Sequence, residues 1–231
     1  IPDRLKPHWD RKVTKRCVMT IPYNAKPFSN RSYIRDAFKE KGVDVDKEEL
    51  TQCVKAVRSA MNLVVPGAMS VMKWIEQEVA RAIRAGASEI RWTTPSGFNV
   101  KQKLMKYKST IIRTQLMGRC EIHIAGAETG VDLNHHKNAT APNLIHSLDA
   151  SLLHLATTST NFPIALIHDS VLCRATDMCT LSSLVRKTYM HLFAEHEPLT
   201  DFALAIGAEE QPPIIGDLKP EAVIDSQYFF C

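Results

Sequence analysis

The sequence lacks the long apolar run that a membrane-spanning helix requires. No stretch of its 231 residues comes near the roughly 18 consecutive apolar residues of such a helix. The first ten residues are polar, charged and interrupted by proline, so a secretory signal peptide is not expected either. We therefore expect no membrane partner. The chain begins with Ile1 and not with methionine, and we expect it to be a piece of a longer protein.

Paired cysteines and internal repeats are also missing. The six cysteines form no C-x-x-C pair, and no nearby histidine has the spacing of a zinc ligand. This scatter favours a reduced intracellular protein over a zinc or disulfide framework. With 45% hydrophobic and 23% charged residues, the chain has the composition of a folded protein that is large enough to bury a core.

Charge is distributed unevenly along the chain. Residues 1–120 hold 24 Lys and Arg against 11 Asp and Glu, a net charge of +13, whereas residues 121–231 hold 5 against 14, a net charge of −9. Such an asymmetry favours a basic surface that binds a polyanion and an acidic surface that could hold metal ions. Two solvated faces that attract each other are the alternative.

Helical and hairpin patterns alternate along the sequence, which predicts an α+β fold that is mostly helical with short antiparallel hairpins. A Pro66-Gly67 turn is expected between two of the helices. The expected helices are an N-terminal one from Asp10 that Pro22 disturbs or ends, then 46–60, 68–85, 141–160 and 177–195. The expected hairpins cover 89–101, 103–137 as an extended hairpin or mobile loop, and 162–174.

The first chemical pattern lies near the N-terminus. Arg11 and Lys15 are four residues apart and project from one face of a helix, and at ~100° per residue Tyr23 is turned from Lys15 by only about 80°. Two cations and a phenol on one side of a helix suit a nucleoside triphosphate, because Arg and Lys bind phosphates and the ring lies near the sugar and base. A solvated basic helix with a core tyrosine is the alternative, and spacing alone does not decide between them.

The second pattern is an apolar strand, a His168-Asp169-Ser170 turn and a return strand. A hairpin tip after a buried strand holds its carboxylate rigid and exposed. Phosphoryl transfer by two metal ions needs such carboxylates, and Mg²⁺ is usually bound through one or two of them. Asp169 fits that role, although an ordinary β-turn is the alternative reading.

These patterns resemble one known family. The R-x3-K-x7-Y spacing in RKVTKRCVMTIPYN resembles the fingers-helix motif of the single-subunit, bacteriophage-T7-like DNA-dependent RNA polymerases, which usually continue Tyr-Gly where this chain has Tyr23-Asn24. His-Asp-Ser at 168–170 resembles their palm motif, and APNLIHSLDA at 141–150 resembles their APNxxHSxD helix start. The three motifs occur in the family's order, and the resemblance covers nearly the whole chain.

The resemblance implies roles for single residues of the fingers helix. Arg11 and Lys15 would contact the phosphates of the incoming nucleotide, and Lys15 is also a candidate proton donor to the leaving pyrophosphate. Tyr23 would sense the sugar 2′-hydroxyl and the templating position. All three would belong to the catalytic or substrate-binding machinery of a nucleotidyltransferase.

The palm and helix motifs imply three further roles. Asp169 would be a ligand of Mg²⁺, and His168 would lie near the 3′ end of the product. His146 would lie near the nucleotide or the minor groove of the hybrid, although a capping or core histidine would be the default if it stood alone. The family's other catalytic carboxylate lies upstream of the fingers helix, so we expect this chain alone to be inactive.

The resemblance also implies a division of the chain. Residues 1–100 would form the fingers with the nucleotide-binding helix, residues 101–140 a promoter-specificity-type hairpin, and residues 141–231 the palm with the carboxylate hairpin and a C-terminal tail. Major-groove reading uses Arg and Glu at base edges, with Lys mostly on phosphates. A loop that only grips phosphates is the alternative. The favoured base readers are Arg113, Arg119, Glu121 and His123.

The expected partners follow from the same resemblance. They are double-stranded promoter DNA, the template strand, nascent RNA and NTPs, and the full-length enzyme is expected to be monomeric. The cytoplasm of a phage-infected bacterium is the expected location, with a mitochondrion or plastid as the alternative. Three other identities remain open: a family-A DNA polymerase fragment, which would usually have His-Asp-Glu in place of His-Asp-Ser, a non-catalytic nucleic-acid-binding module, and a phage-type primase.

Overall fold

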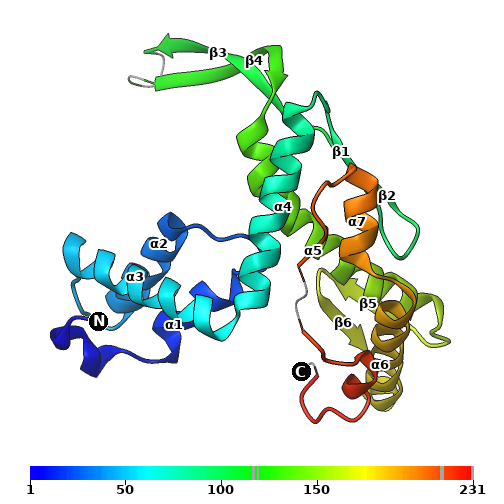
Figure 1. Cartoon of the computed structure of the whole chain (residues 1–231). Helices are drawn as coiled ribbons and strands as arrows, with labels where there is room; N and C mark the ends of the chain where they lie inside the picture. The colour runs from blue at the N-terminus through cyan, green and yellow to red at the C-terminus, as the bar shows by residue number, and fades with distance from the viewer. Residues whose placement is uncertain (116–117, 119, 214–215, 230–231) are drawn as a thin grey trace.

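The structure is a computed structural model, and it describes residues 1–115, 118, 120–213 and 216–229. Figure 1 shows a mostly helical molecule in which the helices surround an upright pair, α4 (Pro66–Arg84) and α5 (Leu133–Thr158), and one long hairpin extends from the top. The described strands form three separate two-stranded antiparallel sheets. The expected α+β fold, mostly helical with short antiparallel hairpins, is therefore confirmed.

The N-terminal helices form one packed unit. A 3-10 helix, η1 (Asp3–His8), precedes α1 (Arg11–Met19), α2 (Pro27–Glu40) and α3 (Lys47–Val64). Helix α1 begins at Asp10 because the Asp10 carboxylate accepts hydrogen bonds from the amides of Lys12 and Val13. The unit has its own apolar core, in which the buried residues include Val13, Cys17, Ile34, Phe38, Leu50 and Val57.

Helix α4 (Pro66–Arg84) begins where a turn was expected. Only Val65 separates it from α3, and the expected Pro66-Gly67 turn is wrong because Pro66 occupies the first helical position. Proline is favoured there, since its fixed φ suits a helix and its missing N–H would be unbonded in any case. The two helices meet at an angle, and α4 continues into the centre of the molecule (Figure 1).

Helix α5 (Leu133–Thr158) packs along α4 and is longer than expected. The sequence prediction placed its start near Pro142, but Asp132 caps the helix by accepting from the amide of His135. Pro142 therefore lies inside the helix, although it removes one hydrogen bond. The flanking turns are held by buried His136, Thr140 and Ala141, so packing outweighs the cost of the proline.

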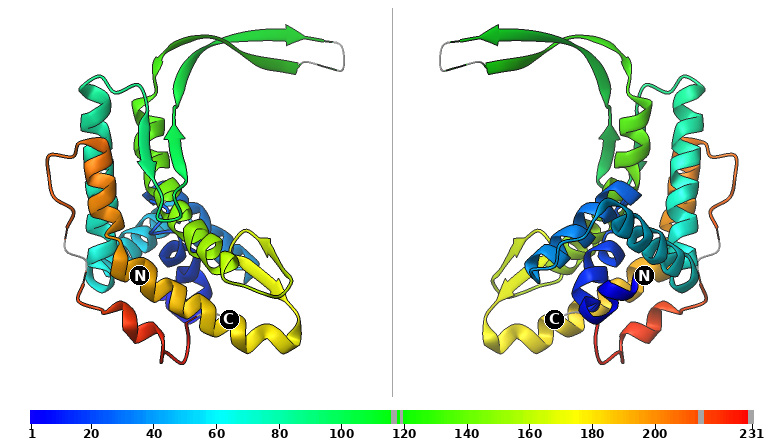
Figure 2. Two further views of the ribbon diagram at one scale, coloured as in Figure 1. Left: turned by 90° about the vertical axis from the view of Figure 1, so that its right-hand side faces the viewer. Right: turned by 90° about the vertical axis from the view of Figure 1, so that its left-hand side faces the viewer.

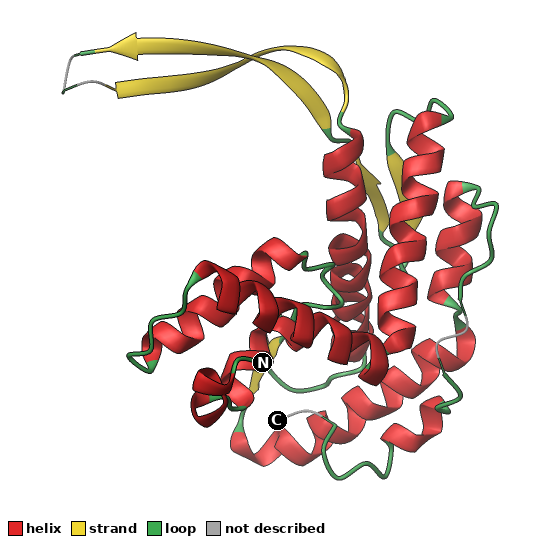
Figure 3. Ribbon diagram, turned by 60° about the vertical axis from the view of Figure 1, so that its left-hand side comes forward, coloured by secondary structure: helices red, strands yellow, loops and turns green. Residues whose placement is uncertain are grey.

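The three hairpins have simple registers. Strands β1 (Ile90–Thr93) and β2 (Asn99–Gln102) pair Ile90 with Gln102, and they pack with α7 (Pro198–Ile206) on the core of α4 and α5. Strands β5 (Ile164–Ile167) and β6 (Ser170–Cys173) pair Ile167 with Ser170 across a two-residue turn. The third hairpin consists of β3 (Met105–Thr114) and β4 (Cys120–Val131), and it curves far away from the helices (Figures 2 and 3).

The C-terminal part wraps around the lower end of α5. It contains η2 (Ala175–Asp177), α6 (Met178–Glu195), α7 (Pro198–Ile206) and η3 (Pro220–Val223). Helix α6 was expected, whereas α2 and α7 were not. Both missed helices begin with a proline at the first helical position, where proline is a start signal.

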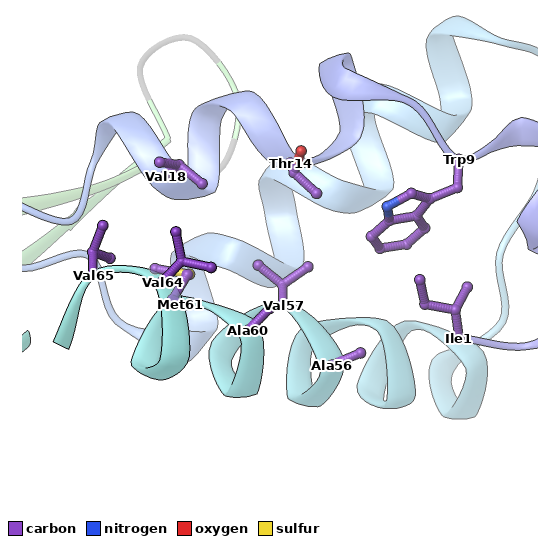
Figure 4. Close-up of a pocket in the computed structure, with 10 residues that line it drawn as sticks. All are labelled: Ile1, Trp9, Thr14, Val18, Ala56, Val57, Ala60, Met61, Val64 and Val65. Carbon is purple, nitrogen blue, oxygen red and sulfur yellow. The ribbon is translucent and has the colours of Figure 1, made fainter.

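An apolar groove runs between α1 and α3. Figure 4 shows Trp9, Thr14 and Val18 on one wall and Val57, Met61 and other α3 residues on the opposite wall, around a volume of about 260 Å³. Among the residues that the structure describes, no helix combines the length and the apolar character needed to cross a bilayer.

Candidate functional site

Helix α1 carries the two predicted phosphate ligands on its exposed side. Arg11 and Lys15 are both exposed, whereas Val13 and Cys17 on the opposite side are fully buried in the N-terminal core. Burial of one face therefore fixes the rotation of the helix and points both cations to solvent. This is the arrangement that the spacing predicted.

Tyr23 lies in a turn after α1 and not on the helix. The helix ends at Met19, and the chain then turns with hydrogen bonds from the amide of Tyr23 to the carbonyl of Thr20 and from the amide of Asn24 to that of Ile21. The prediction of one continuous helical face through Tyr23 is therefore wrong. Pro22 accounts for the difference, because it has no N–H and disfavours helical backbone in the residue before it.

The turn places Tyr23 against His146 of α5. The two rings are stacked, with centroids 4.7 Å apart and planes inclined by 17°. Tyr23 comes from the N-terminal unit and His146 from the central helix pair, so the stack joins two parts of the fold. Helix α5 exposes His146 because Leu144, two positions earlier, faces the core.

Asp149 also belongs to this site. It lies in the APNLIHSLDA motif, but no role was predicted for it. It follows His146 by three positions on α5, so the two lie on the same face. Partial burial raises the pKa of the Asp149 carboxyl, the charge of Asp169 raises it further, and His146 acts in the opposite direction. The signal in the sequence was the i, i+3 spacing to a predicted site histidine.

Asp169 lies at the tip of the β5–β6 hairpin. It is exposed, and His168 before it has a positive φ of 55°, a conformation that non-glycine residues seldom adopt. The pKa of Tyr23 is raised by partial burial and then by the negative charges of Asp149 and Asp169. The structure therefore brings the Tyr23 turn, α5 and the hairpin tip within electrostatic reach of one another.

The β5–β6 hairpin itself is more exposed than expected. The sequence prediction had a buried strand before Asp169, but Ile167 is 58% exposed and Leu172 is 56% exposed. The prediction inferred burial from an apolar run, and this hairpin has only two strands, so it leaves these side chains open. The rigidity of the Asp169 position rests on the tight turn and its ladder of backbone hydrogen bonds.

The donor set is compatible with Mg²⁺ only in part. Within the described parts of the chain, no group of three or more His, Cys, Asp or Glu side chains is placed to hold a metal ion. Mg²⁺ commonly uses one or two protein carboxylates together with substrate phosphates and water. Asp169 can supply one such carboxylate, and Asp149 contributes negative charge close by.

The β3–β4 hairpin sorts the predicted base readers onto one face. Cross-strand partners are Arg113 with Glu121 and Ile111 with His123, so these four residues point to the same side. Arg113 Nε donates to Glu121 Oε1 at 2.9 Å. The opposite face carries residues such as Ile112, Ile122 and Ile124, which are exposed to a similar degree. Arg119, the remaining predicted reader, lies outside the described residues.

A buried polar cluster joins the base of this hairpin to α5. The amide of Leu104 donates to His136 Nε2 at 3.1 Å, and the side-chain amide of Gln102 lies 3.2 Å from His136 Nδ1. Gln102 also contacts Thr140 Oγ1 at 2.7 Å and accepts from Asn143 Nδ2 at 2.7 Å. Burial lowers the pKa of His136, which favours the neutral ring at the base of the β3–β4 hairpin.

Comparison with known proteins places these features in a family. The sequence profile of the DNA-dependent RNA polymerases matches residues 2–209. The DNA-directed RNA polymerase of Pseudomonas phage phiKMV is 28% identical over an aligned length of 236 positions, and the alignment covers 96% of this chain and 29% of the phage protein.

Plant relatives show the same similarity. DNA-directed RNA polymerase 1, mitochondrial, of Nicotiana sylvestris is 30% identical over 96% of this chain, and the match covers 23% of that protein. DNA-directed RNA polymerase 2A of Nicotiana tabacum is also 30% identical, and there the match covers 69% of the relative. The chain thus spans less than a third of the phage and mitochondrial relatives. A family match over most of its residues shows that this chain belongs to the DNA-dependent RNA polymerases.

Proposed function

We propose that this chain is the fingers-and-palm part of a DNA-directed RNA polymerase, which adds NTPs to an RNA 3′ end under the direction of a DNA template. The observation that carries the proposal is the junction of Tyr23, His146 and Asp169. Three segments far apart in the sequence meet there, at the end of a helix whose exposed face holds two cations. An enzyme that grips a triphosphate and a growing strand needs both kinds of group together.

The reaction is an in-line nucleotidyl transfer. The 3′-hydroxyl of the RNA releases its proton to solvent as its oxygen bonds to the α-phosphorus of the NTP, and the bond from that phosphorus to the bridging oxygen breaks so that pyrophosphate leaves. Arg11 and Lys15 bind the phosphates, and Lys15 donates a proton to the leaving pyrophosphate. Tyr23 contacts the sugar 2′-hydroxyl, and His168 lies beside the RNA 3′ end.

His146 supports the Tyr23 ring in this arrangement and faces the nucleotide or the hybrid. The stacked contact restricts rotation of the Tyr23 ring. A ring held in one orientation discriminates better between sugars with and without a 2′-hydroxyl than a mobile ring does. Mg²⁺ bound through Asp169 would neutralise the charge that develops on the phosphates. The second carboxylate that this chemistry needs would come from outside this chain, so we propose that the chain alone does not polymerise RNA.

The β3–β4 hairpin supplies the proposed contact with double-stranded promoter DNA. A two-stranded ribbon fits the major groove, and the face with Arg113, Glu121 and His123 offers donors and acceptors for base edges. Arg119 is assigned to the same task from the sequence. The template strand and the nascent RNA would follow the basic N-terminal half.

We also propose a monomeric full-length enzyme in the cytoplasm of a phage-infected bacterium. The similarity to a phage protein supports this location, while the similarity to mitochondrial and chloroplastic relatives keeps an organelle as the second candidate. Among the earlier alternatives, a DNA polymerase is disfavoured by the family match.

The direct test is Asp169→Asn in the polymerase that contains this chain. Template-directed synthesis from promoter DNA with Mg²⁺ and NTPs should fall at least about a hundredfold, because an essential charge at the reacting phosphates is lost. Asp201→Asn, at an exposed position in the first turn of α7, is the matched control and should synthesise normally. Equal activity of both variants would contradict the proposal and favour a non-catalytic nucleic-acid-binding module. Primer extension by the isolated chain would contradict its expected inactivity.

A further inference from the structure

The turn that carries Tyr23 is tied to helix α4 by the next residue. The side-chain amide of Asn24 donates through Nδ2 to Glu76 Oε1 at 2.6 Å. Lys26 Nζ donates to Asn24 Oδ1 at 3.0 Å and also forms an ion pair with Glu76. Glu76 is partly buried, which strengthens these bonds relative to exposed ones. Asn24, Lys26 and Glu76 together are called the latch.

Helix α3 holds the same turn from another direction. Arg58 donates through Nη1 to the carbonyl of Ala25 at 2.9 Å and to Asn30 Oδ1 at 3.3 Å. Burial lowers the pKa of Lys26, and the nearby positive charges of Lys137 and Arg58 lower it further. The latch therefore lies among several cations, and Glu76 supplies the negative charge that pairs with Lys26.

Asn24 is suited to this position for two reasons. Its φ is +57°, a left-handed conformation that glycine, asparagine and aspartate adopt at low cost. Glycine would satisfy the backbone but would offer no side chain to bond with α4. Asparagine satisfies the backbone and donates to Glu76 with the same residue.

Helix α4 connects the latch to the partner of Tyr23. It packs along α5, and α5 carries His146. The latch thus ties the Tyr23 turn to α4, and α4 also packs against the helix that carries His146. Both rings of the Tyr23–His146 stack are therefore positioned by α4. A shift of Asn24 would move Tyr23, its direct neighbour in the chain, relative to His146.

We propose that the latch, through the Asn24–Glu76 bond, is a positioning device that sets the angle of Tyr23 and so sharpens the choice of ribonucleotides over deoxyribonucleotides. The inference rests on the proposed function, because it needs Tyr23 to contact the nucleotide sugar. Asn24, Lys26 and Glu76 act through Tyr23 and do not touch the substrate. A merely structural link would change stability but would leave sugar selection unaltered.

The test uses the whole polymerase and exchanges donor and acceptor. Asn24→Asp keeps the left-handed backbone and the contact with Lys26 but has no amide to donate to Glu76, so the bond to α4 is lost. In Asn24→Asp with Glu76→Gln, the new amide can donate to the new carboxylate, which restores the bond in reverse. Asn24→Gly keeps the backbone and removes the link. Gln77→Ala, at the exposed next position of α4, is the control.

The measurement is the ratio of kcat/KM for an NTP to that for the matching dNTP, together with the melting temperature. We expect the ratio to fall roughly tenfold in Asn24→Asp and in Asn24→Gly, the effect of one lost hydrogen bond on positioning. The double variant should return to within about twofold of the wild type. Gln77→Ala should leave the ratio unchanged.

Two outcomes would overturn the proposal in different ways. Suppose that Tyr23→Phe lowers the ratio. An unchanged ratio in the folded Asn24→Gly variant, or no recovery in the double variant, would then disprove the role of the latch and leave the sugar contact of Tyr23 intact. If Tyr23→Phe also left the ratio unchanged, the sugar contact assigned under the proposed function would fail, and the latch with it. The melting temperature shows whether each variant is folded at the assay temperature. Asn24→Gly adds no new charge, so a change in its ratio would come from the lost link to α4.

Discussion

The junction around Tyr23 and the β3–β4 hairpin assemble their side chains in opposite ways. At the junction, Tyr23, His146 and Asp169 come from three elements: the turn after α1, the middle of α5 and the tip of the β5–β6 hairpin. On the hairpin, Arg113, Glu121 and His123 are brought to one face by strand register alone. The junction depends on packing between elements, whereas the hairpin depends on a local ladder of backbone hydrogen bonds.

This difference predicts how each region responds to substitution. A register keeps its geometry when a side chain on the exposed face is replaced, so the proposed base contacts could change while the hairpin keeps its shape. At the junction, a substitution that moves the Tyr23 turn disturbs several contacts at once, because the turn is bonded to two helices and Tyr23 stacks on His146. Substitutions in the hairpin should therefore alter specificity, and substitutions near the junction should alter rate and sugar selection.

Lys15→Ala should have the largest effect of the variants below. It removes the proposed proton donor for pyrophosphate, and loss of general acid catalysis typically costs a factor of about 10²–10⁴ in rate. Single-turnover synthesis measures the rate, and a salt titration of DNA affinity measures binding. Arg16→Ala, at an exposed position on the same helix, is the control. Equal losses of rate and DNA affinity in Lys15→Ala would count against the assigned role.

An exchange of the hairpin pair should give the next largest effect. Arg113→Glu with Glu121→Arg keeps a cross-strand ion pair but reverses what each strand presents to DNA. Promoter preference should change by about 1–3 kcal/mol at the contacted base pair, while the overall rate on the best promoter stays similar. Competition between promoter variants gives the measurement.

A phosphate contact provides the contrast for that exchange. Lys108→Ala should weaken binding to all promoters alike and should reduce the salt dependence of affinity. If the Arg113 and Glu121 exchange also lowered the affinity for all promoters alike, the hairpin would contact phosphates without reading bases. It would then act as a basic loop without sequence specificity.

Tyr23→Phe should have a smaller effect that is confined to sugar selection. The variant keeps the ring that stacks on His146 but loses the hydroxyl, so the junction should remain assembled. Rejection of deoxynucleotides should weaken roughly tenfold, as expected for one lost hydrogen bond. Competition between an NTP and its dNTP measures the change. Unchanged discrimination would show that the phenol does not contact the sugar.

The smallest effect is expected at the base of the hairpin and depends on pH. The folded state lowers the pKa of His136 below its ordinary value of 6.5, so the unfolded state binds the proton more readily. The stability that neutral His136 contributes is complete above about pH 6.5 and is lost as the pH falls below it. Protonation of Nε2 also breaks the bond from the Leu104 amide, at a cost of about 1 kcal/mol.

His136→Gln tests this assignment. Its side-chain oxygen can accept from the Leu104 amide at any pH, so the variant should lose less stability than the wild type between pH 7 and about pH 5. Thermal melts over that range give the measurement. Parallel curves for the two proteins would show that His136 is not the group that titrates.

Much of the local structure could be predicted from the sequence. Asp10 marked the start of the cationic helix, the 46–60 pattern marked α3, and the 89–101 pattern marked the first hairpin. The His168-Asp169 turn was also correct, because a short polar pair between two apolar runs specifies a tight hairpin. These elements follow from periodicity, capping and turn chemistry, which act within a few residues.

Other features could not be predicted in the same way. Pro22 was expected to disturb or end the first helix, and α1 does end before it, but the single face through Arg11, Lys15 and Tyr23 assumed an unbroken helix. The start of α5 was placed near Pro142, although the helix begins at Leu133. Asp149 was missed because its neighbour Asp169 lies on another element. The exposure of the β5–β6 strands was missed because an apolar run does not state what covers it.

The sequence by itself determined the family, the cationic helix, the hairpins and the acidic turn, since motif spacing and local hydrogen bonding are encoded by neighbouring residues. Only the tertiary structure decided that Tyr23 stacks on His146, that Asn24 is tied to Glu76, and that Asp149 lies within electrostatic reach of Asp169. Those contacts depend on how α1, α4 and α5 pack in three dimensions. Packing minimises the exposure of apolar faces over the whole molecule, and no local pattern contains that information.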